Sequence, residues 1–228
     1  MEHVFLEYGI VLLLMTALAI LMGRWLAHAF ADKNHTIVER LSYRMLGVNP
    51  EEPMNWARYG LALLLSNAAM MLLGYVLLRL QGVLPLNELG NPAQAPDQAF
   101  NTAVSFITNT NWQSYGGETS LSNATQMVVI TFLMFCGATA GVAAAGGFIR
   151  GLARASAQDI GNYWVDFMRV LWRVLLPLCS IVALVYVWQG MPQTLDAQAI
   201  ASTVEGVKQQ IILGPVASFE TIKHIGTN

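Results

Sequence analysis

The sequence predicts an all-α membrane protein, and three observations support this prediction. Of its 228 residues, 55% are hydrophobic and only 11% are charged, so the mean hydropathy of +0.48 exceeds that of soluble domains with a polar surface. Four apolar stretches reach the ~20 helical residues needed to cross a hydrocarbon core. Nineteen glycines and eight prolines fit the same class, because both are commoner in membrane helices than in soluble ones.

The predicted spans run over Val4–Ala29, Trp56–Leu80, Gln126–Ile149 and Trp164–Trp188. The first is not typical of a signal peptide, because Met1–Gly9 contains Glu2 and Glu7 and no Lys or Arg. Its apolar run is also too long for one. We therefore interpret it as an uncleaved first span.

The basic residues predict the orientation, since Lys and Arg near span ends are retained on the cytoplasmic side. They gather in the first and third connections and their flanks: Arg24, Lys33, Arg40, Arg44, Arg58, Arg150, Arg154, Arg169 and Arg173. The second connection, Gln81–Thr125, has acidic residues but no Lys or Arg. We expect this connection, the segment after Gly190 and the N-terminus to lie outside.

The second connection contains a moderately apolar stretch, Gln98–Thr108, that is too short to span a membrane. Asp97 after Pro96 is a candidate N-cap, and the ~11 residues that follow make about three helical turns. We expect a re-entrant half-helix that enters from outside. The partial negative charge at its C-terminus favours a cation at that depth.

The segment TNTNWQSYGGE, Thr108–Glu118, follows the half-helix and is uncharged up to Glu118. Such backbone is tolerated at membrane depth only where protein buries it or it lines a water-filled path. Potassium filters replace hydration water by carbonyl oxygens, and a short Thr/Asn segment offers them without a fixed charge. Taken alone, the segment fits a helix C-cap and turn equally well.

An internal repeat favours the filter. After the fourth span come an acidic loop, then two amphipathic pieces within Ser202–Ile225 that break at Gly214-Pro215. The chain ends at GTN, Gly226–Asn228, and Gly226 lies 117 positions after Asn109. The order of span, loop, half-helix and filter thus occurs twice.

Five segments, namely TNTNWQSYGGET, NTAVSF, NYWVDFMR, VEGVKQQ and the terminal GTN, closely resemble KdpA, the channel-like subunit family of the Kdp potassium-transporting ATPase. The resemblance implies an extra N-terminal transmembrane helix followed by span/pore-helix/span repeats of the potassium-channel-like type. It also implies that the filter binds external potassium ions and passes them to a P-type ATPase partner, which hydrolyses ATP. Small accessory membrane subunits, the lipid bilayer and a bacterial inner-membrane location follow from the same resemblance.

The resemblance also implies the site. Asn109, Thr110 and Asn111 supply filter oxygens, and Gln113 influences selectivity just beyond them. The whole predicted potassium-binding filter comprises Thr108, Asn109, Thr110, Asn111, Gln113, Gly226, Thr227 and Asn228.

The expected divisions are an extra helix with its cytoplasmic loop over 1–55, a first pore repeat over 56–161 and an incomplete second repeat over 162–228. A fourfold filter cannot then be closed by this polypeptide alone, so we expect a truncated or partial sequence. The rival function is a non-conducting membrane scaffold. No nucleotide-binding motif, paired carboxylates or His cluster indicates an enzyme, and no basic run indicates nucleic-acid binding.

Several polar and charged residues outside the filter segment allow two interpretations. Asp166 with Arg169 and Arg173 at i+3 and i+7 is expected to form an ion pair on the helix surface, the alternative for the arginines being a partner subunit or anionic lipid. Asn67 is expected to bind a neighbouring helix, the alternative being the ion path. Glu118 is either a cation-concentrating carboxylate or a solvated one.

Small and sulfur-containing side chains are expected to serve packing. Gly137 and Gly141 form a GxxxG that Ala145 extends, and we expect this small face to contact the half-helix. Cys136 and Cys179 lie in apolar segments and are expected to fill the core.

Overall fold

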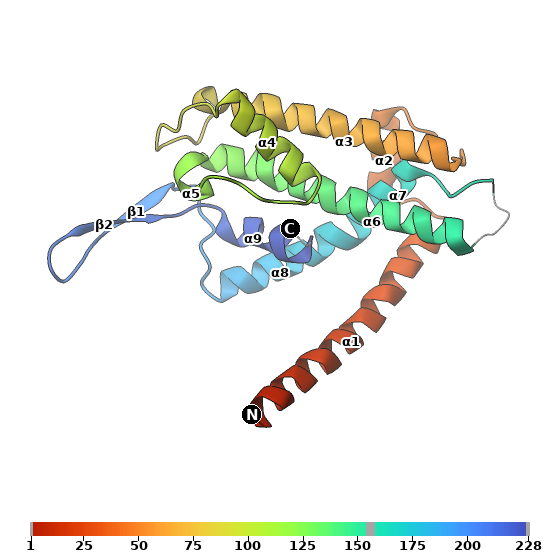
Figure 1. Ribbon diagram of the computed structural model, residues 1–228, viewed down its shortest axis with the longest axis horizontal. Helices are drawn as coiled ribbons and strands as arrows, with labels where there is room; N and C mark the ends of the chain where they lie inside the picture. The colour runs from red at the N-terminus through yellow and green to blue at the C-terminus, as the bar shows by residue number, and fades with distance from the viewer. Residues whose placement is uncertain (1, 154–157, 227–228) are drawn as a thin grey trace.

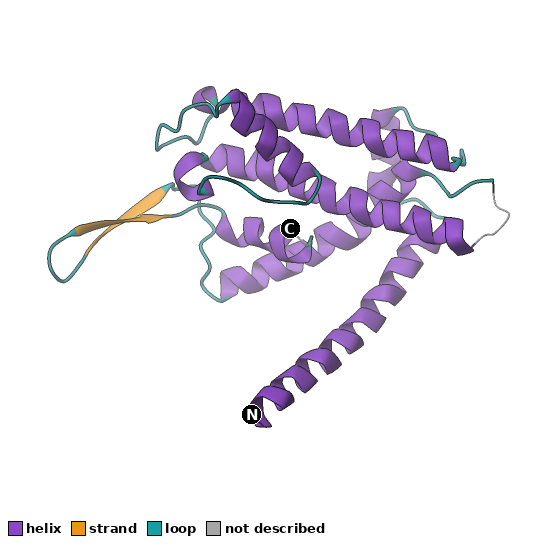
Figure 2. Ribbon diagram, in the orientation of Figure 1, coloured by secondary structure: helices purple, strands orange, loops and turns teal. Residues whose placement is uncertain are grey.

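A computed structural model of the protein describes residues 2–153 and 158–226. It is mostly helical, with one β-hairpin (Figures 1 and 2). The elements are α1 (Glu2–Ala31), α2 (Ile37–Leu46), α3 (Trp56–Arg79), α4 (Pro96–Ile107), α5 (Gly117–Ser120), α6 (Thr131–Ala153), α7 (Tyr163–Arg169), α8 (Leu176–Trp188), β1 (Gln198–Ser202), β2 (Lys208–Ile212) and α9 (Val216–Ile225). A 3₁₀ turn covers Gln81–Val83, and π-helical segments at Thr125–Ile130 and Val170–Leu175 join α6 and α8 to the residues before them.

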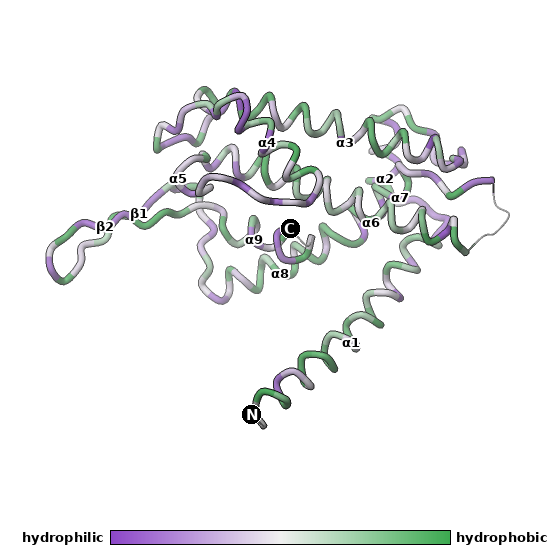
Figure 3. Tube along the Cα trace, viewed as in Figure 1, coloured by the Kyte–Doolittle hydropathy of each residue, from purple (hydrophilic) through white to green (hydrophobic). Residues whose placement is uncertain are grey.

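The predicted membrane class is confirmed. Within the described residues, four helical stretches are long and apolar enough to cross a membrane: Val4–Ala31, Trp56–Arg79, Thr125–Ala153 and Tyr163–Trp188. They appear as the long, mainly green segments of Figure 3. The observed ends agree closely with the predicted ones, because an uninterrupted apolar run is the strongest signal that a sequence carries.

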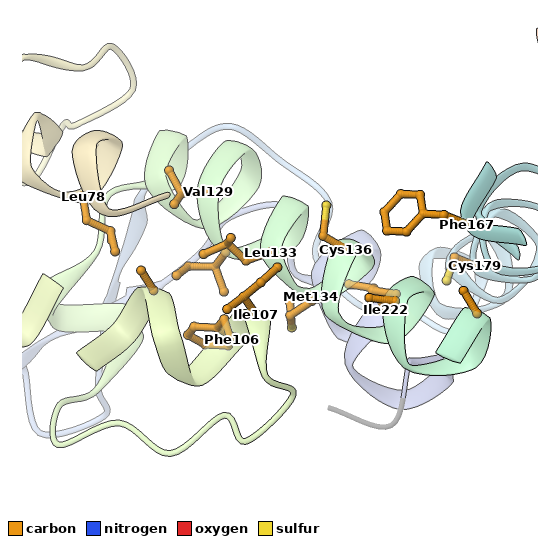
Figure 4. Close-up of a cluster of buried hydrophobic side chains, with 14 of the residues drawn as sticks. Leu78, Phe106, Ile107, Val129, Leu133, Met134, Cys136, Phe167, Cys179 and Ile222 are labelled. Carbon is orange, nitrogen blue, oxygen red and sulfur yellow. The ribbon is translucent and has the colours of Figure 1, made fainter. Parts of the chain in front are cut away.

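The spans α3 and α6 lie side by side, and α4 packs across both of them (Figure 1). On the other side of α6, α9 lies against α8. Phe106 of α4, Leu133 of α6 and Ile222 of α9 belong to one buried cluster (Figure 4). By contrast, α1 leaves the bundle, and none of its apolar window is buried.

One glycine decides how closely α4 approaches α6. A Cβ placed on Gly137 would lie 2.9 Å from the carbonyl oxygens of both Phe106 and Ile107. The expected contact between the small face and the half-helix is therefore correct at Gly137. It is wrong at Gly141 and Ala145, which are exposed; a Cβ on Gly141 would meet no described atom within 4 Å.

Helix α4 begins two residues earlier than predicted, at Pro96 instead of Gln98. Its N-cap is Ala95, Pro96 occupies the first turn and Asp97 lies inside the helix. The prediction of Asp97 as N-cap is therefore wrong. The fixed φ of proline suits the first helical position, where its missing N–H costs nothing, and Asp97 still carries its negative charge in the first turn.

The hairpin corrects the expectation of an all-α chain locally. The sequence predicts one amphipathic piece from Ser202 to the break at Gly214, but the structure has antiparallel strands paired from Gln198 with Ile212 to Ser202 with Lys208. The turn between them uses Gly206 at φ 78°, a conformation that glycine adopts without strain. The predicted break is present, because Gly214 has φ 151° and α9 starts at Val216.

The surface ion pair predicted for Asp166 is wrong. Asp166 is buried and pairs with Arg150 of α6, and the Tyr59 hydroxyl donates to its Oδ2 at 2.9 Å. The guanidinium of Arg169 instead donates to the carbonyls of Phe30 and Asp32. These partners come from other elements, which spacing along one helix could not reveal.

Arg173 also turns inward. Its Nε lies 2.5 Å from Glu39 Oε1 and its Nη1 2.7 Å from Asp32 Oδ2, so it joins α2 and the end of α1 to the fourth span. For Asn67 the structure shows a bond within its own helix, from Nδ2 to the Leu63 carbonyl. Its neighbour Ser66 makes the interhelical bond, 2.7 Å to the Tyr163 hydroxyl.

Acid should loosen the attachment of α2. Burial alone would raise the pKa of Glu39, but hydrogen bonds from Arg173 and Thr36 hold it below its ordinary value. A depressed pKa stabilises the fold above the unfolded-state value near 4.5, and this contribution is lost as the pH falls through the folded-state pKa. Glu39→Gln should therefore reduce the free energy of unfolding at pH 7 by about 1.5–3 kcal/mol, the contribution of its charged hydrogen bonds. The unfolding temperature should fall accordingly.

The difference between Glu39→Gln and the unmutated protein should shrink as the pH falls below 4.5. Thermal unfolding of the detergent-solubilised protein at pH 7 and pH 4 measures this. Glu205→Gln, on the exposed hairpin loop, is the matched control. A pH-independent difference would contradict the prediction.

Candidate functional site

The loop after α4 is held by the last turn of that helix. The amide of Thr110 donates to the Ser105 carbonyl at 2.9 Å, and that of Asn111 donates to the same oxygen at 3.2 Å. Asn109 and Asn111 take left-handed backbone conformations, with φ of 61° and 55°. Asparagine tolerates this region better than most residues, which explains why it alternates with threonine here.

Ser105 is the residue that fixes the second half of the loop. Its hydroxyl oxygen accepts from the Trp112 amide at 2.9 Å and from Gln113 Nε2 at 3.3 Å. A further bond joins the Thr102 and Tyr115 hydroxyls at 2.9 Å. Sequence reasoning missed both α4 residues, although hydroxyl side chains one turn apart on an otherwise apolar half-helix were a visible signal.

Oxygen atoms accumulate at the start of the loop. The hydroxyls of Thr108 and Thr110 lie 2.9 Å apart. Among the described residues, no hydrogen bond ends on the backbone carbonyl of Thr108 or of Thr110. These carbonyls are therefore available as ligands for a cation, next to the C-terminal end of α4.

The structure brings the two predicted filter segments together at one point. Asn109 Nδ2 donates to the Gly226 carbonyl at 3.2 Å, across 117 positions of the chain. These are the equivalent positions in the proposed repeat. Thr227 and Asn228, which were predicted as site residues, lie outside the described residues.

A cavity of about 400 Å³ separates the loop from α9. Asn111, Gln113 and Glu118 line it from the segment after α4, and Glu220 and Lys223 line it from α9. Lys223 Nζ lies 3.0 Å from Glu220 Oε1, so one of the two carboxylates is already paired. The sequence had indicated Glu118 but not the pair on α9, because its helical face was known only after folding.

Between Thr108 and Gln113 the site offers only uncharged ligands, whereas the wall formed by α9 carries charged side chains. In the part of the chain that the structure describes, no group of three His, Cys, Asp or Glu side chains could hold a metal ion. The loop instead offers carbonyl, hydroxyl and amide oxygens, which suit a weakly held monovalent cation.

Comparison with known proteins gives a consistent result. The profile of the family described as "Potassium-transporting ATPase A subunit" (KdpA) matches residues 9–228. The chain is 72% identical over 223 residues to the potassium-transporting ATPase potassium-binding subunit of Delftia acidovorans, covering 98% of this chain and 39% of that protein.

Two further relatives carry the same name. The protein of Granulibacter bethesdensis is 52% identical over 191 residues, covering 84% of this chain and 34% of its own length. That of a Methylorubrum extorquens strain is 48% identical over 228 residues, covering 97% of this chain and 39% of its own length. The chain thus spans about two fifths or less of the length of these curated relatives.

Proposed function

The chain belongs to the KdpA family of potassium-transporting ATPase A subunits, and from this premise we propose that it selects potassium ions with the loop Thr108–Gln113. The ions come from the outer side of the bacterial inner membrane. They then pass to the P-type ATPase subunit of an ATP-driven uptake complex. The names of the relatives, all potassium-binding subunits, support this role.

The observation that carries the proposal is the backbone of the loop. The backbone is left-handed at Asn109 and Asn111, on either side of Thr110, whose φ is not positive. This alternation keeps the loop out of a regular helix or strand, and no hydrogen bond from the described residues ends on the carbonyls of Thr108 and Thr110. Carbonyls of this kind can replace the hydration shell of a potassium ion.

The helix α4 contributes electrostatically. Its C-terminal end, at Ile107, carries about half a negative charge from the aligned peptide dipoles. This charge is fixed in place and is spread over carbonyls, so it attracts a cation without the tight binding of a carboxylate. A dehydrated ion beside Thr108 and Thr110 therefore meets a favourable potential that still allows it to move on.

The proposal assigns three regions. Residues 1–55 form the extra helix and cytoplasmic loop, 56–161 the first pore repeat and 162–228 part of the second. The N-terminus lies outside, with the hairpin and the cavity on the same side. Gly226, Thr227 and Asn228 are the second-repeat counterparts of 109–111, and ATP hydrolysis belongs to a partner chain, accompanied by small accessory membrane subunits.

Substitutions in the loop test the proposal. In the full-length protein within its complex, Gln113→Arg places a positive charge beside the ion path, and Asn111→Asp adds a negative charge that traps the ion. Potassium-limited growth and the potassium-to-sodium preference of uptake should both fall by an order of magnitude or more. Gln209→Arg, the same change on the exposed strand β2, should alter neither.

Unchanged growth and ion preference in both loop variants would overturn the filter assignment. The chain would then be better described as a scaffold that assembles with other subunits without conducting. Measuring assembly of the complex in each variant separates a lost filter from a lost subunit.

A further inference from the structure

Helix α2 is oriented with its polar side toward the protein and its apolar side away from it. Glu39 and Tyr43, one turn apart, are 0% and 2% exposed. Ile37, Leu41 and Met45, which also recur every four residues, are 77%, 54% and 79% exposed. A soluble protein would place these two sets the other way round, so the apolar stripe requires an explanation.

This orientation is fixed by strong contacts. Thr36 and Glu39 form a reciprocal capping box at the start of the helix, and Gly47 ends it with φ 64°. Arg173 then holds Glu39 through both carboxylate oxygens, at 2.5 and 2.6 Å. The helix cannot rotate to bury its apolar stripe without breaking a charged pair in a buried position, which costs several kcal/mol.

The surroundings of α2 indicate what its outer face meets. In Figure 1, α2 runs across the direction of the spans, near the ends of α3 and α7. It directly follows the connection from α1, a helix whose apolar surface is also exposed. Trp172, 37% exposed, donates from Nε1 to Ser42 at 3.2 Å, and tryptophan of this kind marks the boundary between lipid and water.

The charges beside the apolar stripe also indicate contact with a membrane surface. Arg40 and Arg44 lie on one flank of the apolar stripe and are exposed. Within the described chain, no acidic side chain pairs with either of them. Arg169 and Arg173, for which lipid contact had been an alternative, are turned inward, so Arg40 and Arg44 are the arginines of α2 that can reach a headgroup.

We propose that α2 is an interfacial helix that inserts Ile37, Leu41 and Met45 among the acyl chains of the adjacent leaflet and binds anionic lipid headgroups through Arg40 and Arg44. Amphipathic helices with a basic flank lie in the membrane plane in this way. A protein partner on α2 alone fits less well. One face of a ten-residue helix, ~15 Å long and ~10 Å wide, offers far less than the ~800 Å² per partner of a specific interface.

Site-specific quenching tests the insertion. The full-length protein carries a single labelled cysteine at Met45→Cys, its other cysteines being replaced, in nanodiscs of phosphatidylcholine and phosphatidylglycerol at about 3:1. Nitroxide groups on the acyl chains should quench this probe severalfold more than aqueous iodide does. The matched control, Glu51→Cys on the exposed connection after α2, should show the reverse.

Two outcomes would overturn the insertion. Quenching of the position-45 probe by iodide, as at position 51, would place the stripe in water. Protection from both quenchers would mean that protein covers it. Neither outcome bears on the ion loop, so this proposal and the proposed function fail independently.

The charge part of the proposal has its own test. With the probe at position 45, spin-labelled phosphatidylglycerol should quench more efficiently than spin-labelled phosphatidylcholine, by a preference of about fivefold per arginine. Arg40→Gln with Arg44→Gln should abolish the preference. Arg58→Gln, which removes an arginine already paired with Glu52 at 2.6 Å, should retain it. An unchanged preference in the double variant would refute the assignment of the headgroup site.

Discussion

Replacing Gly137 by alanine should weaken potassium binding by the full-length protein on the order of tenfold, whereas Gly141→Ala should leave it unchanged. The added Cβ at position 137 would lie 2.9 Å from the carbonyl oxygens of Phe106 and Ile107, closer than van der Waals contact allows. Both oxygens belong to the backbone, so no side-chain rotation relieves the clash. The end of α4 must move, and the proposed filter loop moves with it.

The size of this effect follows from the cost of overpacking, about 1–3 kcal/mol. Since about 1.4 kcal/mol corresponds to tenfold in affinity, a displaced loop that no longer surrounds the ion should bind it at least that much more weakly. Equilibrium binding of potassium to the purified protein measures the effect, and hydrogen exchange over residues 108–116 reports the loop directly.

Gly141→Ala is the appropriate control because it lies one turn further along the same helix. Its Cβ would meet no described atom within 4 Å, and alanine is the better helix former by about 1 kcal/mol. Gly141→Ala should therefore raise the stability of the protein slightly or leave it unchanged. Equal potassium affinity in the two variants would show that the approach of α4 to α6 does not control the loop.

Replacing Arg150 by methionine should destabilise the protein by about 3–5 kcal/mol, the largest effect on folding that we expect. Asp166, 3% exposed, would be left as a buried carboxylate without its guanidinium partner. The substitution also removes the bond from Arg150 Nε to the Ile160 carbonyl at 2.7 Å. The free energy of unfolding in detergent measures the loss.

A double-mutant cycle separates the ion pair from the rest of Arg150. Adding Asp166→Asn to Arg150→Met should recover much of the loss, because no charge is then stranded. Arg58→Gln disrupts an ion pair whose side chains are 56% and 49% exposed, and it should cost less than about 1 kcal/mol. If Arg150→Met were as mild as Arg58→Gln, the pair would not matter for folding.

Much of the candidate site could be predicted because its residues are contiguous. The half-helix and the Thr/Asn segment after it were found at nearly their observed bounds, with Pro96 and Ile107 as the observed ends of α4. The assignment of Thr108–Gln113 as filter residues stays a prediction. Ser105, which holds the loop, was not found, because its role depends on where the chain returns after Asn111.

By itself, the sequence determined the membrane class, the four spans and the place of the loop between them. These properties are local: apolar runs of sufficient length, and polar residues that interrupt them, act through solvation without any knowledge of neighbours. Only the tertiary structure decided which distant groups meet. Asp166 pairs with Arg150 and not with Arg169, Asn109 contacts Gly226, and the apolar side of α2 faces outward. Each of these outcomes depends on how helices from separate parts of the chain pack together.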